Sequence, residues 1–453
     1  MSRKIKLLQT EARLLATLAA PILMAQLAHQ TLAFVDTLMA GRVSAIDLAG
    51  VAVGGSLWIP TYLFIHGVLL SITPMVAQLA GAGRTDETGP LVRRGLLVAI
   101  PLALVAILLL RHAGFVFSRM EVAPQVASIS IRYLNGISWG VPALALFLLL
   151  RNLSEGLGLT RPSMVIGLAS IPVNAVCNYL LIYGKMGLPA LGGAGCGWAS
   201  ALTLWFMCGC MLLTVWRIRR YRMTHFFDFA KGHGSEGAGH IIRLGLPIGF
   251  SLLVEASAFA LIALFLSPLG GRVVAAHQIT LNYSSLIFIL PLSIAIAITI
   301  RVGHAVGRKR YDRARLVSNA GLLLNLFIAL ATVAVTLTCA RQIAGIYTRD
   351  GEVIFIALGL LNLNALYQLP DAFQVGAAAA LRGYKDTRIP LGLIVIAYWV
   401  IGLPLGYSLA MTDFWGRPMG AKGFWISLIA GLSAAAVLLG GRLFLVGRRH
   451  LRP

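Results

Sequence analysis

The sequence predicts an all-α integral membrane protein in which twelve transmembrane helices form two six-helix lobes. Three observations support this prediction. The chain of 453 residues is 58% hydrophobic and only 12% charged, with a mean hydropathy of +0.83, and no soluble domain of this length needs so much apolar surface. Apolar stretches of the roughly 20 residues that cross a bilayer recur along the whole chain. Finally, the second half of the sequence repeats the first.

The repeat has an offset of 226 or 227 residues, which is half the length of the chain. An offset of 226 places Pro21 on Pro247, and an offset of 227 places Trp198 on Trp425. Because each half holds an even number of helices, both halves have the same topology in the membrane. We therefore expect a pseudo-two-fold axis along the bilayer normal.

The candidate helices follow from breaks at charges, Gly-Pro clusters and polar runs. The first lobe, residues 1–216, holds spans at roughly 14–39, 46–80, 91–110, 124–150, 163–184 and 190–216. The second lobe, residues 241–453, holds spans at roughly 241–269, 272–300, 316–338, 352–381, 388–411 and 421–446. The polar segment between them, residues 217–240, contains RIRRYR and KGHGSEGAGH and is expected to be a cytoplasmic linker.

The distribution of basic residues predicts the orientation in the membrane. With a cytoplasmic N-terminus, 28 of the 38 Lys and Arg residues fall in cytoplasmic segments, which predicts that both termini are cytoplasmic. The same asymmetry accounts for the net charge of +22, so no nucleic-acid partner is needed. The five cysteines lie in apolar segments without a CxxC pair, and we expect neither a disulfide framework nor a cysteine metal site.

Three of the sixteen acidic residues interrupt apolar stretches, namely Asp36, Glu255 and Asp371. A carboxylate in hydrocarbon costs about 2.5–3.5 kcal/mol even on the mild insertion scale, so these acids indicate function. A structural acid paired with a neighbouring helix is the alternative, and it applies most to Asp36. We expect no intramembrane Lys or Arg to pair with them. A proton, a hard cation such as Na⁺ or a cationic organic substrate would then neutralise them.

The neighbours of the second-lobe acids fit this interpretation. Tyr367 lies four residues before Asp371 and shares its helix face, where it offers a hydroxyl group and a π-face. Phe259 lies one turn after Glu255.

Two further polar pairs lie in apolar helices. Asn174 and Asn178 are four residues apart, and either helix packing or a functional role explains them. Gln278 and Asn282 form a second such pair. The adjacent His277 is expected to be a hydrogen-bonded packing residue in preference to a proton relay. HExxH, GxSxG and Walker A motifs are missing from the sequence, so we expect neither an enzyme nor ATP hydrolysis.

Six segments resemble the MATE family of multidrug and toxic compound extrusion transporters, and within it the bacterial NorM-like branch. They are VDTLMAG (35–41), PMVAQLAGAGR (74–84), VAAHQ (274–278), IRVGHAVG (300–307), LRGYKDTR (381–388) and GAKGFW (420–425). The resemblance implies alternating access and export of cationic amphiphilic drugs and dyes in exchange for inward Na⁺ or H⁺. It also implies antibiotic resistance and a location in the bacterial inner membrane.

The resemblance also implies site residues. The cation site would be formed by Glu255 and Asp371, with Tyr367 nearby, and Na⁺ is its candidate metal ion. The residues linked to substrate or to protons would be Asp36, Asn174, Asn178, Phe259 and Gln278. Some relatives carry an aspartate at the position of Asn178, so one titratable group is missing here.

The implied partners are small-molecule drugs, the coupling ion and membrane lipid, with no cofactor and no obligatory protein partner. The alternative function is a flippase for lipid-linked precursors of the same superfamily. Such a flippase is expected to have a more cationic cavity for its diphosphate, whereas the intramembrane charges found here are acidic.

Overall fold

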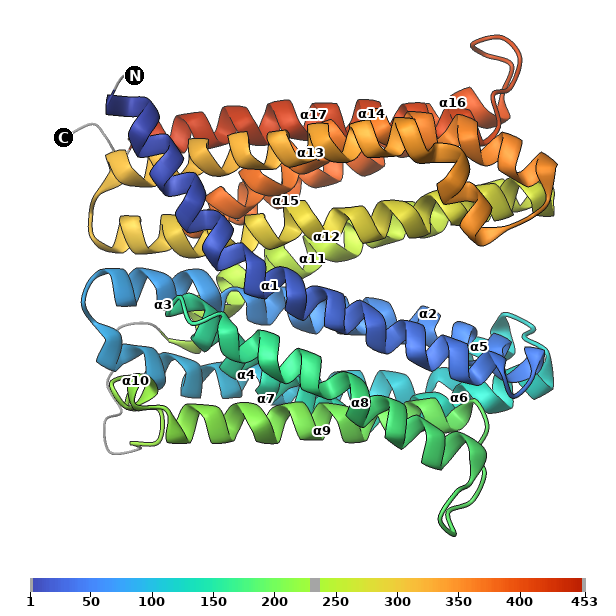
Figure 1. Ribbon diagram of the computed structural model, residues 1–453, viewed down its shortest axis with the longest axis horizontal. Helices are drawn as coiled ribbons and strands as arrows, with labels where there is room; N and C mark the ends of the chain where they lie inside the picture. The colour runs from blue at the N-terminus through green and yellow to red at the C-terminus, as the bar shows by residue number, and fades with distance from the viewer. Residues whose placement is uncertain (1–2, 229–236, 450–453) are drawn as a thin grey trace. The chain divides into compact units, whose positions relative to one another are not determined.

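The computed structural model describes residues 3–228 and 237–449, and all their regular structure is helical (Figure 1). The chain forms two compact units, Ala20–Gly249 and Met1–Ala19 with Phe250–Pro453. We call these the N-lobe and the C-lobe. The chain passes between them inside two helices, α1 (Arg3–Gly41) and α11 (Ala238–Leu266). The linker predicted at 217–240 stays a prediction, and its residues 229–236 lie outside the described part of the chain.

The N-lobe contains the remainder of α1 and the helices that follow it up to α10. They are α2 (Ala45–Leu70), α3 (Ile72–Gly81), η1 (Thr85–Glu87), α4 (Thr88–Arg111), α5 (Ala113–Arg119), α6 (Pro124–Ser138), α7 (Val141–Gly156), α8 (Arg161–Tyr183), α9 (Ala194–Arg217) and α10 (Arg219–Arg222). Helix α9 packs against α6, α7 and α8.

The C-lobe contains most of α11 and the helices that follow it. They are η2 (Ser267–Leu269), α12 (Gly271–Gly307), α13 (Tyr311–Tyr347), α14 (Gly351–Gly383), α15 (Arg388–Val395), the π-helical η3 (Ile396–Gly402), α16 (Leu403–Met411) and α17 (Ala421–Arg449). Helix α14 packs against α12, α13 and α17 and is therefore the central helix of this lobe (Figure 1).

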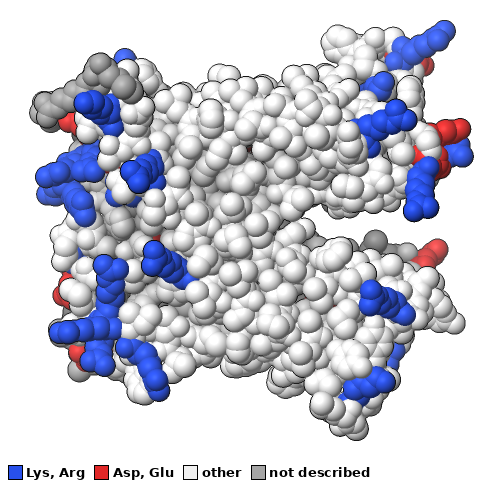
Figure 2. Space-filling model, in the orientation of Figure 1, with Lys and Arg blue, Asp and Glu red and all other residues white. Residues whose placement is uncertain are grey.

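The predicted number of spans is confirmed once a bent pair of helices is counted as one span. Eleven helical segments of the described chain are long and apolar enough to cross a membrane, and α6 with α7 adds a twelfth span bent by 48°. The bend follows from Pro142 in the first turn of α7, because proline cannot donate to the preceding turn. On the face shown in Figure 2, the Lys and Arg side chains of each lobe gather at the helix ends, and the surface between them is almost free of charged side chains.

The sequence repeat also appears as a repeated close contact inside each lobe. In the N-lobe, a Cβ atom on Gly156 would lie 2.7 Å from Cβ of Val76. In the C-lobe, a Cβ atom on Gly383 would also lie 2.7 Å from Cβ of Val302. These residues correspond through the offsets of 226 and 227. Only glycine permits this approach of two helices. The two lobes therefore pack the corresponding pair of helices in the same way.

The first turns of α1 are held in the C-lobe by a buried acid. Glu11 is only 2% exposed and forms salt bridges with Arg301 of α12 and with Arg313 of α13, the latter at 2.7 Å. Two guanidinium groups around one carboxylate compensate its desolvation. This contact explains why residues before Ala20 belong to the C-lobe.

Candidate cation and substrate sites

Helices α11 and α14 bring the two acids of the C-lobe into one cluster. The side-chain amide Nε2 of Gln374 donates a hydrogen bond to Oε1 of Glu255 at 3.0 Å. Gln374 lies three residues after Asp371, on the same face of α14, so the bond holds the Glu255 carboxylate on the side of Asp371. The two carboxylates interact electrostatically, and Asp371 is only 6% exposed. We call Glu255, Asp371 and Gln374 the C-lobe acid cluster.

No intramembrane Lys or Arg is expected to pair with these acids, and one arginine of the lobe influences Glu255 without forming a salt bridge with it. Arg382 lies in the last turn of α14 and interacts electrostatically with Glu255. It was assigned to a cytoplasmic loop, but α14 continues to Gly383 and carries it into the lobe. Among the described residues, no Lys or Arg nitrogen lies within 4 Å of either carboxylate of the cluster. The cluster therefore contains two acids and only a remote guanidinium group.

Aromatic side chains border the C-lobe acid cluster. Tyr367 lies one turn before Asp371 and packs edge-to-face on Trp425, with ring centroids 5.6 Å apart. Phe259 packs edge-to-face on Tyr398, with centroids 6.4 Å apart. Tyr398 interacts electrostatically with both acids of the cluster. Tyr367 and Phe259 thus lie on the same helices as the two acids and within the aromatic border of the cluster, and their roles stay predictions.

Sequence reasoning missed Gln374 and Tyr398. Tyr398 lies in η3, where the Leu403 N–H bonds to the Tyr398 carbonyl five residues earlier. The following residue, Pro404, supplies no N–H to the α-helical ladder, and this explains the local π-helical geometry. Single-turn π segments often mark functional sites, so the Leu-Pro pair at 403–404 was an available signal.

A second polar cluster lies in the N-lobe around Asp36 of α1. The Asn178 amide Nδ2 donates to Oδ1 of Asp36 at 2.6 Å and to Oδ1 of Asn174 at 3.0 Å. Ser200 of α9 donates from Oγ to Oδ2 of Asp36 at 2.8 Å. Both oxygens of the carboxylate therefore accept a hydrogen bond from a neutral donor. The structure brings Asp36, Asn174 and Asn178 together, and it adds Ser200, which the sequence analysis missed.

Gln278 is not brought to either cluster. It is exposed on α12, as is Asn282, and within the described chain no hydrogen bond joins it to the C-lobe acids. The neighbouring His277 is fully buried, and its Nδ1 accepts a hydrogen bond from Nε1 of Trp425 at 3.3 Å. This geometry fits the packing role expected for His277. Among the described residues, no group of three or more His, Cys, Asp and Glu side chains could hold a metal ion.

Comparison with known proteins shows similarity over almost the whole chain. The MatE family model matches residues 21–180 and 247–408, one segment in each copy of the repeat. The chain is 46% identical over 435 residues to the probable multidrug resistance protein NorM of Shewanella oneidensis, covering 96% of this chain and 94% of that protein. It is 44% identical over 455 residues to the multidrug resistance protein PmpM of Pseudomonas aeruginosa, covering 100% and 95%.

Solved structures with low sequence identity show the same fold. The eukaryotic MATE transporter AtDTX14 superposes with a TM-score of 0.87 at 19% identity, covering 98% of this chain and 99% of that one. A Pyrococcus furiosus transporter of the MOP superfamily superposes with a TM-score of 0.87 at 17% identity, covering 100% of both chains. A reversed polarity of its binding pocket suggests a different function for that protein. Proteins with this fold can therefore differ in the substrate they transport, and the substrate of this chain has to be inferred from its own side chains.

Proposed function

The chain belongs to the MATE family of transporters, and we propose that it exports cationic amphiphilic drugs and dyes in exchange for an inward coupling ion. The observation that supports this proposal is the C-lobe acid cluster. The relatives named as multidrug resistance proteins support the efflux of drugs. No cofactor enters the proposal, and the coupling ion is Na⁺ or H⁺.

The charges of the C-lobe explain why a coupling ion would bind. Glu255 and Asp371 together carry two negative charges when ionised, and Arg382 offsets one of them from a distance. Uncompensated charge inside a membrane protein is costly, so one monovalent cation or one proton would balance the cluster. The hydroxyl groups of Tyr367 and Tyr398 supply the neutral oxygen atoms that a hard cation prefers beside carboxylates.

Coupling requires that the ion binds more tightly to one conformation of the transporter than to the other. We propose that ion binding at Glu255 and Asp371 provides this difference. Asp36, with Asn174 and Asn178, would then contribute to a substrate-linked or proton-linked site in the N-lobe. Phe259 offers an aromatic face for a cationic drug. Gln278 would contribute only as an exposed residue of α12, away from the acid cluster.

Dye efflux from cells or inside-out vesicles of a strain lacking its own pumps tests the proposal. A Na⁺ gradient alone and a pH gradient alone would be imposed in turn. We expect one of them to drive efflux and expect Glu255→Gln and Asp371→Asn to abolish it. The matched control is Glu352→Gln, because Glu352 is an exposed acid in the first turn of the same helix as Asp371.

The outcomes separate the alternatives. Efflux driven by Na⁺ and lost in Glu255→Gln would support a Na⁺ site, whereas efflux driven only by the pH gradient would support proton coupling, with Asp36→Asn as the next variant. Normal efflux in both C-lobe variants would contradict the role of the cluster. No efflux under either gradient would favour the lipid-linked precursor flippase.

We also propose that the protein lies in the bacterial inner membrane with both termini cytoplasmic. The excess of Lys and Arg on one side of the predicted topology supports this orientation. Fusion of a reporter enzyme that is active only outside the cytoplasm tests it. Activity of a fusion at the C-terminus would contradict the orientation.

A further inference from the structure

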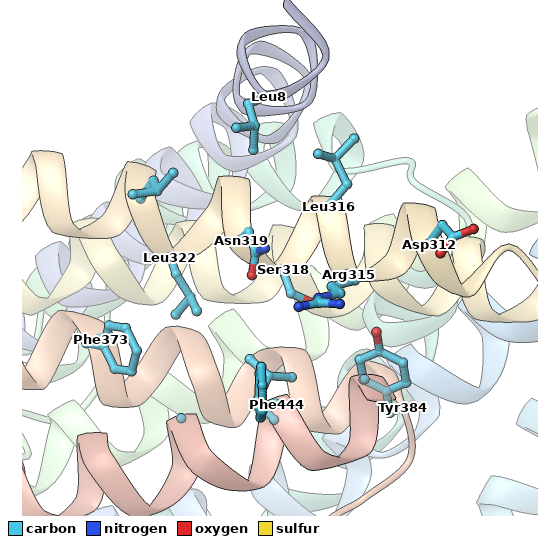
Figure 3. Close-up of a pocket in the computed structure, with 14 residues that line it drawn as sticks. Leu8, Asp312, Arg315, Leu316, Ser318, Asn319, Leu322, Phe373, Tyr384 and Phe444 are labelled. Carbon is cyan, nitrogen blue, oxygen red and sulfur yellow. The ribbon is translucent and has the colours of Figure 1, made fainter. Parts of the chain in front are cut away.

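A groove in the C-lobe is lined by residues other than those of the acid cluster. It has a volume of about 810 Å³ and is lined by residues of α1, α13, α14 and α17 (Figure 3). Leu322 and Phe373 lie at one end, and Arg315 and Tyr384 lie at the other (Figure 3). Phe373 and Tyr384 are eleven residues apart along α14, which corresponds to about 16 Å of helix. The groove is therefore lined mainly by apolar side chains, with Ser318 and Asn319 partway along it and its charged side chains at one end (Figure 3).

Gly447 of α17 leaves part of the groove open, whereas a Cβ atom on Gly440 would already lie 3.0 Å from the ring of Phe373. Gly440 and Gly447 both line it and are seven residues apart, so they lie on one face of the helix. A Cβ atom added to Gly447 would meet no other atom within 4 Å. The apolar side chains at the rim are accessible, with Leu323 57% and Phe444 46% exposed. In a membrane-spanning lobe, such a surface is suited to a hydrocarbon chain.

Arg315 lines the polar end of the groove, and a second arginine, Arg448, lies beside it on the ring of Phe444. Arg315 and Arg448 both lie over the ring of Phe444, with their Cζ atoms 5.8 and 4.1 Å from its centroid. The two groups are therefore within about 10 Å of each other. In the described part of the chain, no carboxylate lies within 4 Å of either one. Asp312 is the acidic residue of the lining, so the positive charge at this end exceeds the negative charge.

We propose that this groove binds an anionic phospholipid, with its phosphate at Arg315 and Arg448 and one acyl chain along the apolar part between α13 and α17. Arginine is well suited to phosphate because its planar fork donates two parallel hydrogen bonds. The basic helix ends lie on the side of the membrane predicted to be cytoplasmic, whose leaflet carries anionic lipids. Because a zwitterionic lipid has no net charge to match the arginines, we expect selectivity for anionic headgroups. This inference goes beyond the proposed transport function and does not depend on it.

Native mass spectrometry of the full-length protein in detergent tests the proposal. Phosphatidylglycerol and phosphatidylcholine of equal chain length would be titrated separately, and lipid-bound and lipid-free protein would be counted. We expect phosphatidylglycerol to bind at least fivefold more tightly. The double variant Arg315→Gln/Arg448→Gln should lose this preference. Gly447→Phe should weaken the binding of both lipids, because its side chain occupies the space of the acyl chain.

Matched controls come from the same helix. Arg449→Gln removes an exposed charge next to Arg448 that, unlike Arg448, does not lie over the ring of Phe444. Gly441→Phe adds the same bulk outside the lining, where a Cβ atom also meets nothing within 4 Å. Both should bind phosphatidylglycerol like the unmodified protein. Elution as a single species in size-exclusion chromatography identifies the folded variants to be compared.

Three results would overturn the proposal. They are equal binding of the two lipids, unchanged phosphatidylglycerol binding in folded Gly447→Phe, and competition by inorganic phosphate as effective as that by the lipid. The last result would show that a phosphate group suffices and that the groove does not hold an acyl chain.

Discussion

Replacing Gln374 with leucine tests the C-lobe acid cluster at one hydrogen bond. Leucine has a similar volume but cannot donate to Glu255. A hydrogen bond to a charged group contributes about 1.5–3 kcal/mol, and 1.4 kcal/mol corresponds to a factor of ten. If the bond orients Glu255 for the coupling ion, the apparent affinity for that ion should fall about 10- to 150-fold. The hypothesis rests on the bond of 3.0 Å between the two side chains.

The assay is the dependence of dye efflux on the concentration of the driving ion. Gln368→Leu is the matched control, because Gln368 is a buried glutamine of α14 that donates to Thr336 at 2.9 Å and to Asn364 at 3.1 Å. We expect this control to lower the thermal stability and leave the ion dependence unchanged. An unchanged ion dependence in Gln374→Leu, with normal protein levels, would refute the reasoning.

Three further predictions concern packing and the N-lobe. Gly383→Ala should destabilise the protein by about 1–3 kcal/mol through overpacking, whereas Gly441→Ala should not, and thermal unfolding in detergent compares them. Glu11→Gln should cost about 1–3 kcal/mol because two arginines lose their partner, and the exposed Glu352→Gln serves as its control; equal melting temperatures would contradict this. Ser200→Ala should reduce drug resistance by less than Asp36→Asn in a growth assay, because one hydrogen bond to the carboxylate remains; the opposite order would contradict it.

The sequence predicted the helices well because their length and apolar character are local properties. It could not predict the bend between α6 and α7, although Pro142 was visible, because prolines inside other spans leave those helices continuous. The acids themselves were found from their cost in hydrocarbon. Their partners Gln374 and Ser200 were missed because contacts between distant helices depend on tertiary packing.

One further difference has the same origin. Arg382 was placed beyond the span predicted at 352–381 because the end of α14 cannot be located to within one turn from apolar length alone. The substrate-linked role that the resemblance implies for Gln278 stays a prediction; the register of α12 leaves Gln278 exposed and turns His277 towards Trp425. Which side chains meet in the two polar clusters therefore depends on the register of the packed helices, and a single sequence does not specify this register.

The passage of the chain between the two lobes has a mechanical consequence. The unit boundaries fall after Ala19 in α1 and after Gly249 in α11, and each lies within two residues of a proline, Pro21 or Pro247. These prolines correspond through the repeat, and neither provides an N–H for the carbonyl four residues earlier. The two helices that connect the lobes therefore each lack a backbone hydrogen bond, at equivalent positions of the repeat. We expect them to act as paired hinges inherited from one duplicated helix.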